Sequence, residues 1–134
     1  MARILVADDD LDQLIMRKSL LEAGGHQVDM AMCTETTARL VERGGADLVI
    51  MDLRFANAEG EPDSREGLQL IRRIRDLGCR TPVIVLSGWP EDLYGQPEEK
   101  LVSRVIVKPV SMHALLEAIG ELLERRTPPP SPQS

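Results

Sequence analysis

A short aliphatic run that ends on a carboxylate constrains the fold of this chain more than any other feature. The run is DLVIMDL, Asp47–Leu53, and it follows the glycine pair Gly44 and Gly45. Consecutive aliphatic residues at this length are typical of a central strand of a parallel sheet, which is buried on both faces. Asp52 then lies at the carboxyl end of that strand. Ligands of open parallel sheets bind beyond these strand ends, so Asp52 is a candidate for chemistry.

Four further apolar runs predict the other strands of the sheet: Arg3–Ala7, Val28–Met32, Pro82–Leu86 and Val105–Val107. Helical periodicity predicts helices at about Leu11–Ala23, Thr34–Arg43, Gly67–Leu77 and Glu98–Val102, and from Ser111 to Arg125. The fourth helix is expected to be short or irregular, because Pro90, Gly95 and Pro97 interrupt that segment. Strands that alternate with helices indicate an α/β fold with a parallel sheet and helices on both faces.

The segment between the Asp52 strand and the third helix lacks any hydrophobic period. It runs from Phe55 to Glu66, contains Gly60 and Pro62, and is expected to be a long loop. The chain is predicted to form one domain, 1–126, followed by a Pro-rich tail, 127–134. The tail is expected to be disordered, and its alternative role is that of a polyproline ligand for a partner protein.

Composition narrows the possible partners. A net charge of -6 without a basic run argues against binding of nucleic acid or of an anionic membrane surface. No apolar stretch approaches the ~20 residues of a spanning helix, and the N-terminus opens into a strand instead of a signal peptide. Cys33 and Cys79 are isolated, as expected of reduced thiols. The expected location is therefore the cytoplasm.

Polar side chains follow four of the predicted strands: Asp8 and Asp9, then Asp52, Ser87 and Lys108. Three carboxylates at one rim repel one another, and a divalent cation is the simplest relief. Mg²⁺ accepts carboxylates, a carbonyl, waters and a phosphate oxygen in its octahedron. Lys108 and Ser87 would supply a positive charge and a hydroxyl donor to a phosphoryl group. Four complementary strand ends therefore predict a phosphoryl-binding site.

In sequence, the chain resembles the receiver domain of bacterial two-component response regulators. The matching stretches are ILVADDD, VIMDL, VIVLSG and VIVKP, and the resemblance spans about Arg3–Arg126. It implies a flavodoxin-like, doubly wound five-stranded parallel sheet of strand order 2-1-3-4-5. It also implies that Asp52 is the nucleophile that accepts a phosphoryl group from a histidine kinase or phosphotransfer protein. Ser87 and Lys108 resemble the pair that binds the phosphoryl oxygens, and the Lys108–Pro109 bond resembles one that is often cis in the family.

The resemblance implies Mg²⁺ as the cofactor. Its expected ligands are Asp8, Asp9, Asp52 and the backbone carbonyl of Arg54. The expected function is that of a stand-alone receiver, not an enzyme beyond its own phosphorylation and dephosphorylation. It would signal through contact with a downstream protein of unknown identity.

Several positions depart from the family pattern. Phe55-Ala56 replaces the usual Met-Pro, and the glycine that follows in the family corresponds to Gly67, which lengthens the loop. Val105 stands where the family has its aromatic switch residue. We therefore hypothesise that the signal travels through the segment 89–102 and the long loop. Bulky Arg54 and Trp89, two residues after Asp52 and Ser87, suggest a long-lived aspartyl phosphate.

Two other functions are compatible with parts of the pattern. The first is a binding module that keeps the receiver shape and acts without phosphorylation. The second is a haloacid-dehalogenase-like phosphatase, in which Asp8 instead of Asp52 would be the nucleophile. Its motif needs an acidic pair after the lysine, and none follows Lys108.

Overall fold

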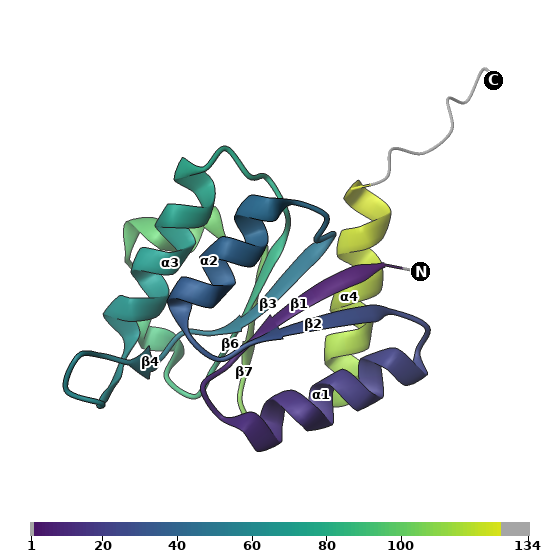
Figure 1. Cartoon of the computed structure of the whole chain (residues 1–134), viewed down its shortest axis with the longest axis horizontal. Helices are drawn as coiled ribbons and strands as arrows, with labels where there is room; N and C mark the ends of the chain where they lie inside the picture. Colours follow the sequence, from purple (N-terminus) through teal and green to yellow (C-terminus); the bar gives the residue numbers. More distant parts are fainter. Residues whose placement is uncertain (1, 127–134) are drawn as a thin grey trace.

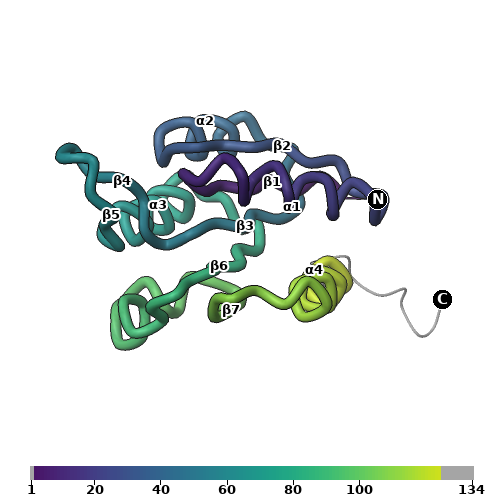
Figure 2. Tube along the Cα trace, turned by 90° about the horizontal axis from the view of Figure 1, so that it is seen from below, coloured from purple at the N-terminus to yellow at the C-terminus, as the bar shows by residue number. Residues whose placement is uncertain are grey.

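The computed structural model describes residues 2–126, so the predicted tail lies outside the described residues. Five parallel strands form the sheet: β1 (Arg3–Ala7), β2 (Gln27–Ala31), β3 (Leu48–Asp52), β6 (Val83–Ser87) and β7 (Arg104–Val107). Their order is β2-β1-β3-β6-β7, which confirms the predicted doubly wound topology. The strands form a twisted row with β3 at its centre (Figure 2).

Four α-helices cover the two faces of this sheet: α1 (Leu11–Ala23), α2 (Thr34–Arg43), α3 (Ser64–Asp76) and α4 (Met112–Arg126). Helices α2 and α3 lie on one side and α1 and α4 on the other (Figure 1). Successive side chains of a strand point to opposite faces of the sheet, so β3 contributes to the hydrophobic core on each face. Val49 and Met51 pack toward α2 and α3, whereas Leu48 and Ile50 pack toward α1 and α4. No helix within residues 2–126 is both long and apolar enough to span a membrane.

The long segment after β3 is more ordered than the sequence suggested. It forms an antiparallel hairpin of β4 (Phe55–Ala56) and β5 (Pro62–Asp63), and α3 begins at Ser64 instead of Gly67. The expectation of a plain loop was wrong because Phe55 is 2% exposed and anchors the hairpin. The Asn57 side-chain oxygen also accepts hydrogen bonds from the amides of Glu59 and Glu61 and closes the turn.

The segment between β6 and β7 lacks an α-helix. It contains two 3₁₀ helices, η1 (Pro90–Asp92) and η2 (Pro97–Leu101). The predicted short, irregular fourth helix is thus confirmed, and it consists of 3₁₀ turns. Each 3₁₀ helix begins with a proline, and Gly95 between them adopts a positive φ of 84°. This backbone cannot continue one helix through the segment.

Candidate functional site

Asp52 ends the central strand, where the side chain is 13% exposed. Its Oδ2 lies 2.9 Å from Lys108 Nζ, which donates a hydrogen bond to it as one half of an ion pair. The amide of Arg54 donates a longer bond, 3.3 Å, to the other oxygen. The structure therefore brings together two residues that are 56 positions apart in the chain.

Asp8 follows β1 and is more deeply buried, with 2% of its surface exposed. Its Oδ1 accepts a hydrogen bond from the Asp10 amide, and its Oδ2 accepts one from Arg17 Nη1, both at 3.0 Å. Burial raises the pKa of the Asp8 carboxyl above its ordinary value of 3.8, and the charge of Asp52 raises it further. The Asp10 amide and Arg17 oppose this increase in the pKa.

Asp9 faces outward beside the hairpin. Its Oδ2 accepts a hydrogen bond of 3.2 Å from the amide of Ala56 in β4. The adjacent Asp10 caps α1, since its Oδ1 accepts bonds from the amides of Asp12 and Gln13. The N-cap of α1 is thus Asp10. The three consecutive acids, Asp8, Asp9 and Asp10, thus have different hydrogen-bond partners.

Ser87 and Lys108 end adjacent strands on the other side of Asp52. Ser87 is 1% exposed, and its Oγ accepts a hydrogen bond of 3.0 Å from the Trp89 amide. The carbonyl of Ser87 accepts a bond of 2.8 Å from the Lys108 amide. The Lys108–Pro109 peptide bond is cis, as the resemblance implied. All of the candidate residues therefore lie on one end of the sheet.

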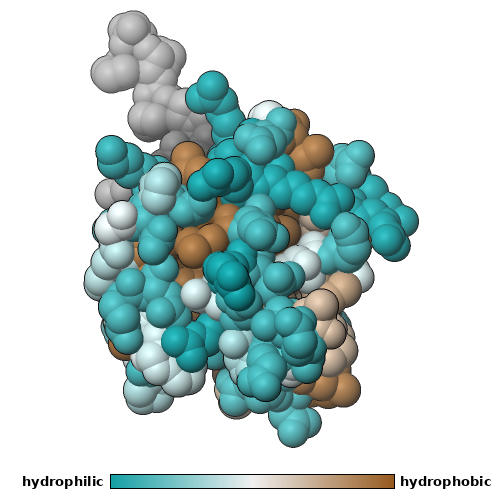
Figure 3. Space-filling model, turned by 90° about the vertical axis from the view of Figure 1, so that its left-hand side faces the viewer, coloured by the Kyte–Doolittle hydropathy of each residue, from teal (hydrophilic) through white to brown (hydrophobic). Residues whose placement is uncertain are grey.

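Arg54 crosses the site and links the two segments that flank it. Its Nε donates a hydrogen bond of 2.8 Å to Asp92 Oδ2 in η1. Its guanidinium also lies 3.7 Å above the centre of the Trp89 ring, in cation–π contact. Figure 3 shows this end of the molecule, where hydrophilic residues surround smaller hydrophobic areas.

Gly67 explains how α3 approaches the residues that follow Asp52. A Cβ at this position would lie 2.0 Å from the carbonyl oxygen of Leu53, well inside van der Waals contact. Only glycine allows the first turn of α3 to press on that backbone. The position agrees with the glycine that the family resemblance assigned.

The oxygen atoms available at this end of the sheet decide whether the predicted magnesium site is chemically reasonable. Within residues 2–126, no three Asp, Glu, His or Cys side chains are grouped closely enough to hold a metal ion alone. Mg²⁺ often uses only one or two carboxylates and completes its octahedron with carbonyls, waters and phosphate oxygens. The oxygens of Asp8, Asp9, Asp52 and the Arg54 carbonyl are hard donors of that kind, so their chemistry fits. Arg17 opposes the fit, because it already contacts Asp8.

Comparison with known families decides the class of this chain. A family model described as "Response regulator receiver domain" matches residues 4–120. The chain belongs to this family. The receiver domain is also 33% identical over 95 residues to the two-component response regulator ORR41 of Oryza sativa subsp. japonica, covering 67% of this chain and 69% of that protein.

A second relative is a longer protein. The receiver domain is 32% identical over 129 residues to the transcriptional regulatory protein GlrR of Escherichia coli K12. That alignment covers 95% of this chain but only 27% of GlrR. The receiver domain therefore matches one part of a larger regulator.

Solved structures agree on the fold. The receiver domain superposes with a TM-score of 0.81 on a response regulator receiver domain protein from Clostridium thermocellum, at 26% identity over 94% of this chain and 97% of that one. TrrA from Thermotoga maritima, solved in complex with Mg(2+)-BeF, gives a TM-score of 0.78 at 24% identity, covering 91% and 99%. The predicted flavodoxin-like receiver fold is confirmed.

Two residues at the site, Asp92 and Arg17, were not predicted from the sequence. Asp92 lies 38 residues from Arg54, and no spacing rule joins them. Arg17 was missed because a charged residue on a helix is normally assigned to the outer face. The structure instead buries Leu14, Arg17 and Leu21, and Ile15 is 48% exposed. Arg17 is three residues after Leu14 and four before Leu21, and this spacing could have placed it on the buried face of the helix.

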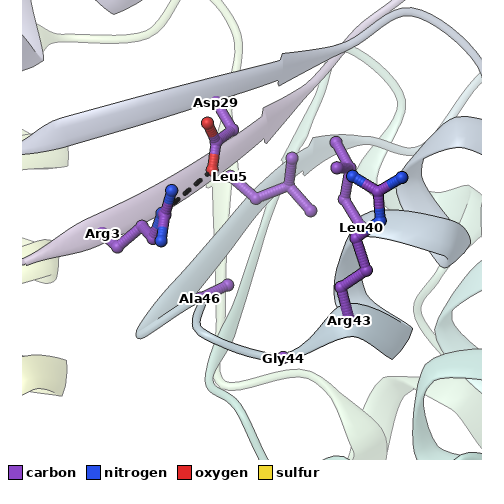
Figure 4. A pocket seen from close by; sticks show the side chains of 7 residues that line it. All are labelled: Arg3, Leu5, Asp29, Leu40, Arg43, Gly44 and Ala46. Carbon is purple, nitrogen blue, oxygen red and sulfur yellow. Dashed lines mark hydrogen bonds and ion pairs between the residues drawn. The ribbon is translucent and has the colours of Figure 1, made fainter.

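The opposite end of the sheet has a cavity of about 280 Å³ that does not belong to the candidate site. Figure 4 shows Arg3 and Asp29 paired along one wall, with Arg43 and Leu40 on the other. Arg3 Nε lies 3.2 Å from Asp29 Oδ2. Because Arg3 begins β1 and Ala46 precedes β3, the cavity lies toward the amino ends of these strands and away from Asp52.

Proposed function

We propose that Asp52 accepts a phosphoryl group from the phosphohistidine of a histidine kinase or phosphotransfer protein. The observation that carries this proposal is the Asp52–Lys108 ion pair, a nearly buried carboxylate held at the end of the central strand. Ligands of doubly wound folds bind at this end, beside the switch point between β1 and β3. Receiver domains are in general signalling modules and not catalytic enzymes.

In the proposed transfer, an oxygen of Asp52 forms a bond to phosphorus while the bond from phosphorus to the histidine nitrogen breaks. The freed imidazole keeps the electron pair and takes a proton from water. Phosphoryl transfer needs mainly positioning and charge neutralisation. Lys108 would pair with a phosphoryl oxygen in place of the carboxylate. The Ser87 hydroxyl, whose oxygen accepts from Trp89, can donate its proton to another oxygen.

Mg²⁺ is part of the proposal. When bound, it would neutralise charge on the carboxylates and on the phosphoryl oxygens. Asp8, Asp9, Asp52 and the Arg54 carbonyl are the residues that would hold it. TrrA, which shares the fold, was solved in complex with Mg(2+)-BeF, and this supports magnesium as the metal of the proposal.

Arg54 and Trp89 suggest a slow loss of the phosphoryl group from Asp52. Hydrolysis of an aspartyl phosphate needs a water in line with the bond between phosphorus and Asp52. Arg54 is held over the site by Asp92 and by the Trp89 ring. Held in this way, Arg54 would restrict the path of water to the phosphoryl group, and we propose a long-lived aspartyl phosphate on this ground.

The signal is proposed to pass to a downstream protein by direct contact. Val105 is a partly buried aliphatic residue and has no ring to reorient. The link from Ser87 Oγ to the Trp89 amide supports a route through the segment 89–102, because a phosphoryl group that engages Ser87 acts on this bond. Amide hydrogen exchange should change in this segment on phosphorylation. Unchanged exchange in both this segment and the hairpin would contradict the route.

The intact mass after treatment with acetyl phosphate tests the function. We expect a gain of one phosphoryl group that requires Mg²⁺ and disappears in Asp52→Asn. The control is Asp76→Asn, an exposed carboxylate at the end of α3 that should leave the gain unchanged.

The same measurement separates the alternatives. No gain in a folded protein would favour a module that acts without phosphorylation. A gain that survives Asp52→Asn would favour the phosphatase-like chemistry at Asp8. The Asp8 side chain is 3% exposed against 13% for Asp52, so a substrate would reach the Asp8 carboxylate less readily, which opposes that role.

A further inference from the structure

Arg17 is a charged residue on the buried face of a helix. It lies between Leu14 and Leu21 on the inner side of α1, and its side chain is 4% exposed. A buried guanidinium is strongly unfavourable unless it is paired and hydrogen-bonded. Its position therefore depends on the partners that the receiver domain provides.

Those partners lie at the rim. Arg17 Nη1 donates to Asp8 Oδ2 at 3.0 Å, and Nη2 donates to Gln13 Oε1 at 3.2 Å. The side chain of Asp8 is itself only 3% exposed, so water screens this ion pair weakly. Arg17 thus places a fixed positive charge against a carboxylate that is a candidate metal ligand.

The rim contains a second internal cation. Lys108 pairs with Asp52, but its side chain is 30% exposed and can move toward solvent or toward a phosphoryl group. Arg17 is enclosed, so its guanidinium charge stays beside Asp8. The charge that a divalent cation would supply at Asp8 is therefore already partly present.

A cavity beside Arg17 gives the side chain a place to move. It has a volume of about 400 Å³ and is lined by Gln13, Met16, Arg17, Lys108, Pro109 and Met112, among others. The cavity lies between α1 and the connection from β7 to α4. A guanidinium that leaves Asp8 can enter this space and stay hydrated.

We propose that Arg17 is a built-in counter-ion that competes with the divalent cation for Asp8 and weakens metal binding. A metal at the rim gains Asp8 as a ligand only when the Arg17–Asp8 pair opens toward the cavity. Arg17 in this sense sets the affinity of the site for the metal. The inference rests on the proposed function for the identity of the metal site.

Isothermal titration of Mg²⁺ into the unphosphorylated protein tests the competition. Arg17→Met keeps the length and apolar stem but removes the charge, and we expect it to bind Mg²⁺ about ten-fold tighter or more, the scale on which groups next to ligands act. Lys18→Met removes the neighbouring charge, which pairs with Glu22 on the outer side of α1, and should leave the affinity unchanged. Equal or weaker binding by a folded Arg17→Met would overturn the proposal, as would absence of binding in both proteins.

A measurement on the unaltered protein covers the case in which Arg17→Met fails to fold. The guanidinium protons of Arg17 can be followed by ¹⁵N NMR, and burial should protect them from exchange with water in the metal-free protein. Saturating Mg²⁺ should accelerate this exchange as the pair opens. Unchanged exchange at saturation would overturn the proposal.

Neither readout uses phosphorylation. A protein that is never phosphorylated on Asp52 but shows the expected affinities would contradict the proposed function and leave the competition standing. A protein that is phosphorylated but shows equal affinities would do the reverse.

Discussion

Two chain segments pass over Asp52, and they are held in different ways. The connection from β3 to α3, 53–63, is anchored by close packing: Leu53 and Phe55 are almost fully buried, and Gly67 presses on the Leu53 carbonyl. The crossover from β6 to β7, 88–103, has one fully buried apolar anchor, Leu93. Polar contacts from α3 hold much of the rest.

Those polar contacts come from two arginines. Arg72 pairs with Glu98, and Arg75 donates to the Leu101 carbonyl of the crossover. Arg75 also donates to the carbonyls of Cys79 and Thr81, which precede β6. Close packing has one favourable arrangement, whereas charged and hydrogen-bonded contacts can exchange for water at a smaller loss of free energy. The first connection therefore fixes the position of Asp52, and the crossover is the part able to respond.

Breaking the close approach in the first connection should have the largest effect. Gly67→Ala places a methyl group against the Leu53 carbonyl and should reduce the free energy of unfolding by about 3 kcal/mol, the upper part of the usual overpacking range. Urea unfolding measures the change. Gly120→Ala is the matched control, since a Cβ in α4 at this position meets nothing within 4 Å and should stabilise by up to about 1 kcal/mol. Equal stabilities of the two variants would contradict the packing argument.

Removing the main polar anchor of the crossover should have a smaller effect on stability. Arg75→Met leaves the carbonyls of Leu101, Cys79 and Thr81 without their donor and should reduce the free energy of unfolding by about 1–3 kcal/mol. Hydrogen exchange should also rise in η2. The exposed Arg80→Met is the control, and a loss as small as the control's would show that the crossover is held by other contacts.

The bridge between the two segments should act on phosphate lifetime instead of stability. Arg54→Ala and Trp89→Ala each remove one side of the cation–π contact, so we expect several-fold faster loss of the aspartyl phosphate. Decay of the phosphorylated mass over time measures the rate. Tyr94→Ala removes an equally exposed aromatic ring from the same crossover and should leave the rate unchanged. If all three variants decay at the wild-type rate, the covering residues do not restrict water.

The smallest expected effect concerns Asp63, which ends the first connection and is the N-cap of α3. Hydrogen bonds from the side chain and the backbone amide of Arg65 hold the pKa of Asp63 well below its ordinary value of 3.8. A hydrogen bond from the Asn57 side chain lowers this pKa further. A lowered carboxyl pKa stabilises the fold above the ordinary value, and this contribution is lost as the pH falls through the lowered pKa. The stability difference between wild type and Asp63→Asn should therefore shrink as the pH falls below 3.8. A difference that is constant with pH would contradict the pairing.

The sequence predicted the fold and the rim because both depend on short local patterns. Asp8, Asp52, Ser87 and Lys108 each end or directly follow an apolar strand, and parallel strands place such ends together. The prolines of the crossover likewise predicted its irregular helix. The hairpin was missed because Gly60 and Pro62 are typical of loops and its anchor, Phe55, is a single residue.

The contacts of Arg17 and Arg54 could not be predicted in this way. Their partners come from a neighbouring strand end and from a distant 3₁₀ helix, and each depends on how packed elements meet. A charged residue on a helix is normally assigned to the outer face. Tertiary pairing reversed that assignment for Arg17.

The central claim is that Asp52 carries the phosphoryl group, and chemical mapping tests it most directly. Borohydride reduces an acyl phosphate to an alcohol, so a phosphorylated aspartate becomes homoserine and can be located by peptide mass spectrometry. After acetyl phosphate and Mg²⁺, we predict homoserine at position 52 in the wild-type protein. Homoserine at position 8, or at no position in a folded protein, would contradict the account.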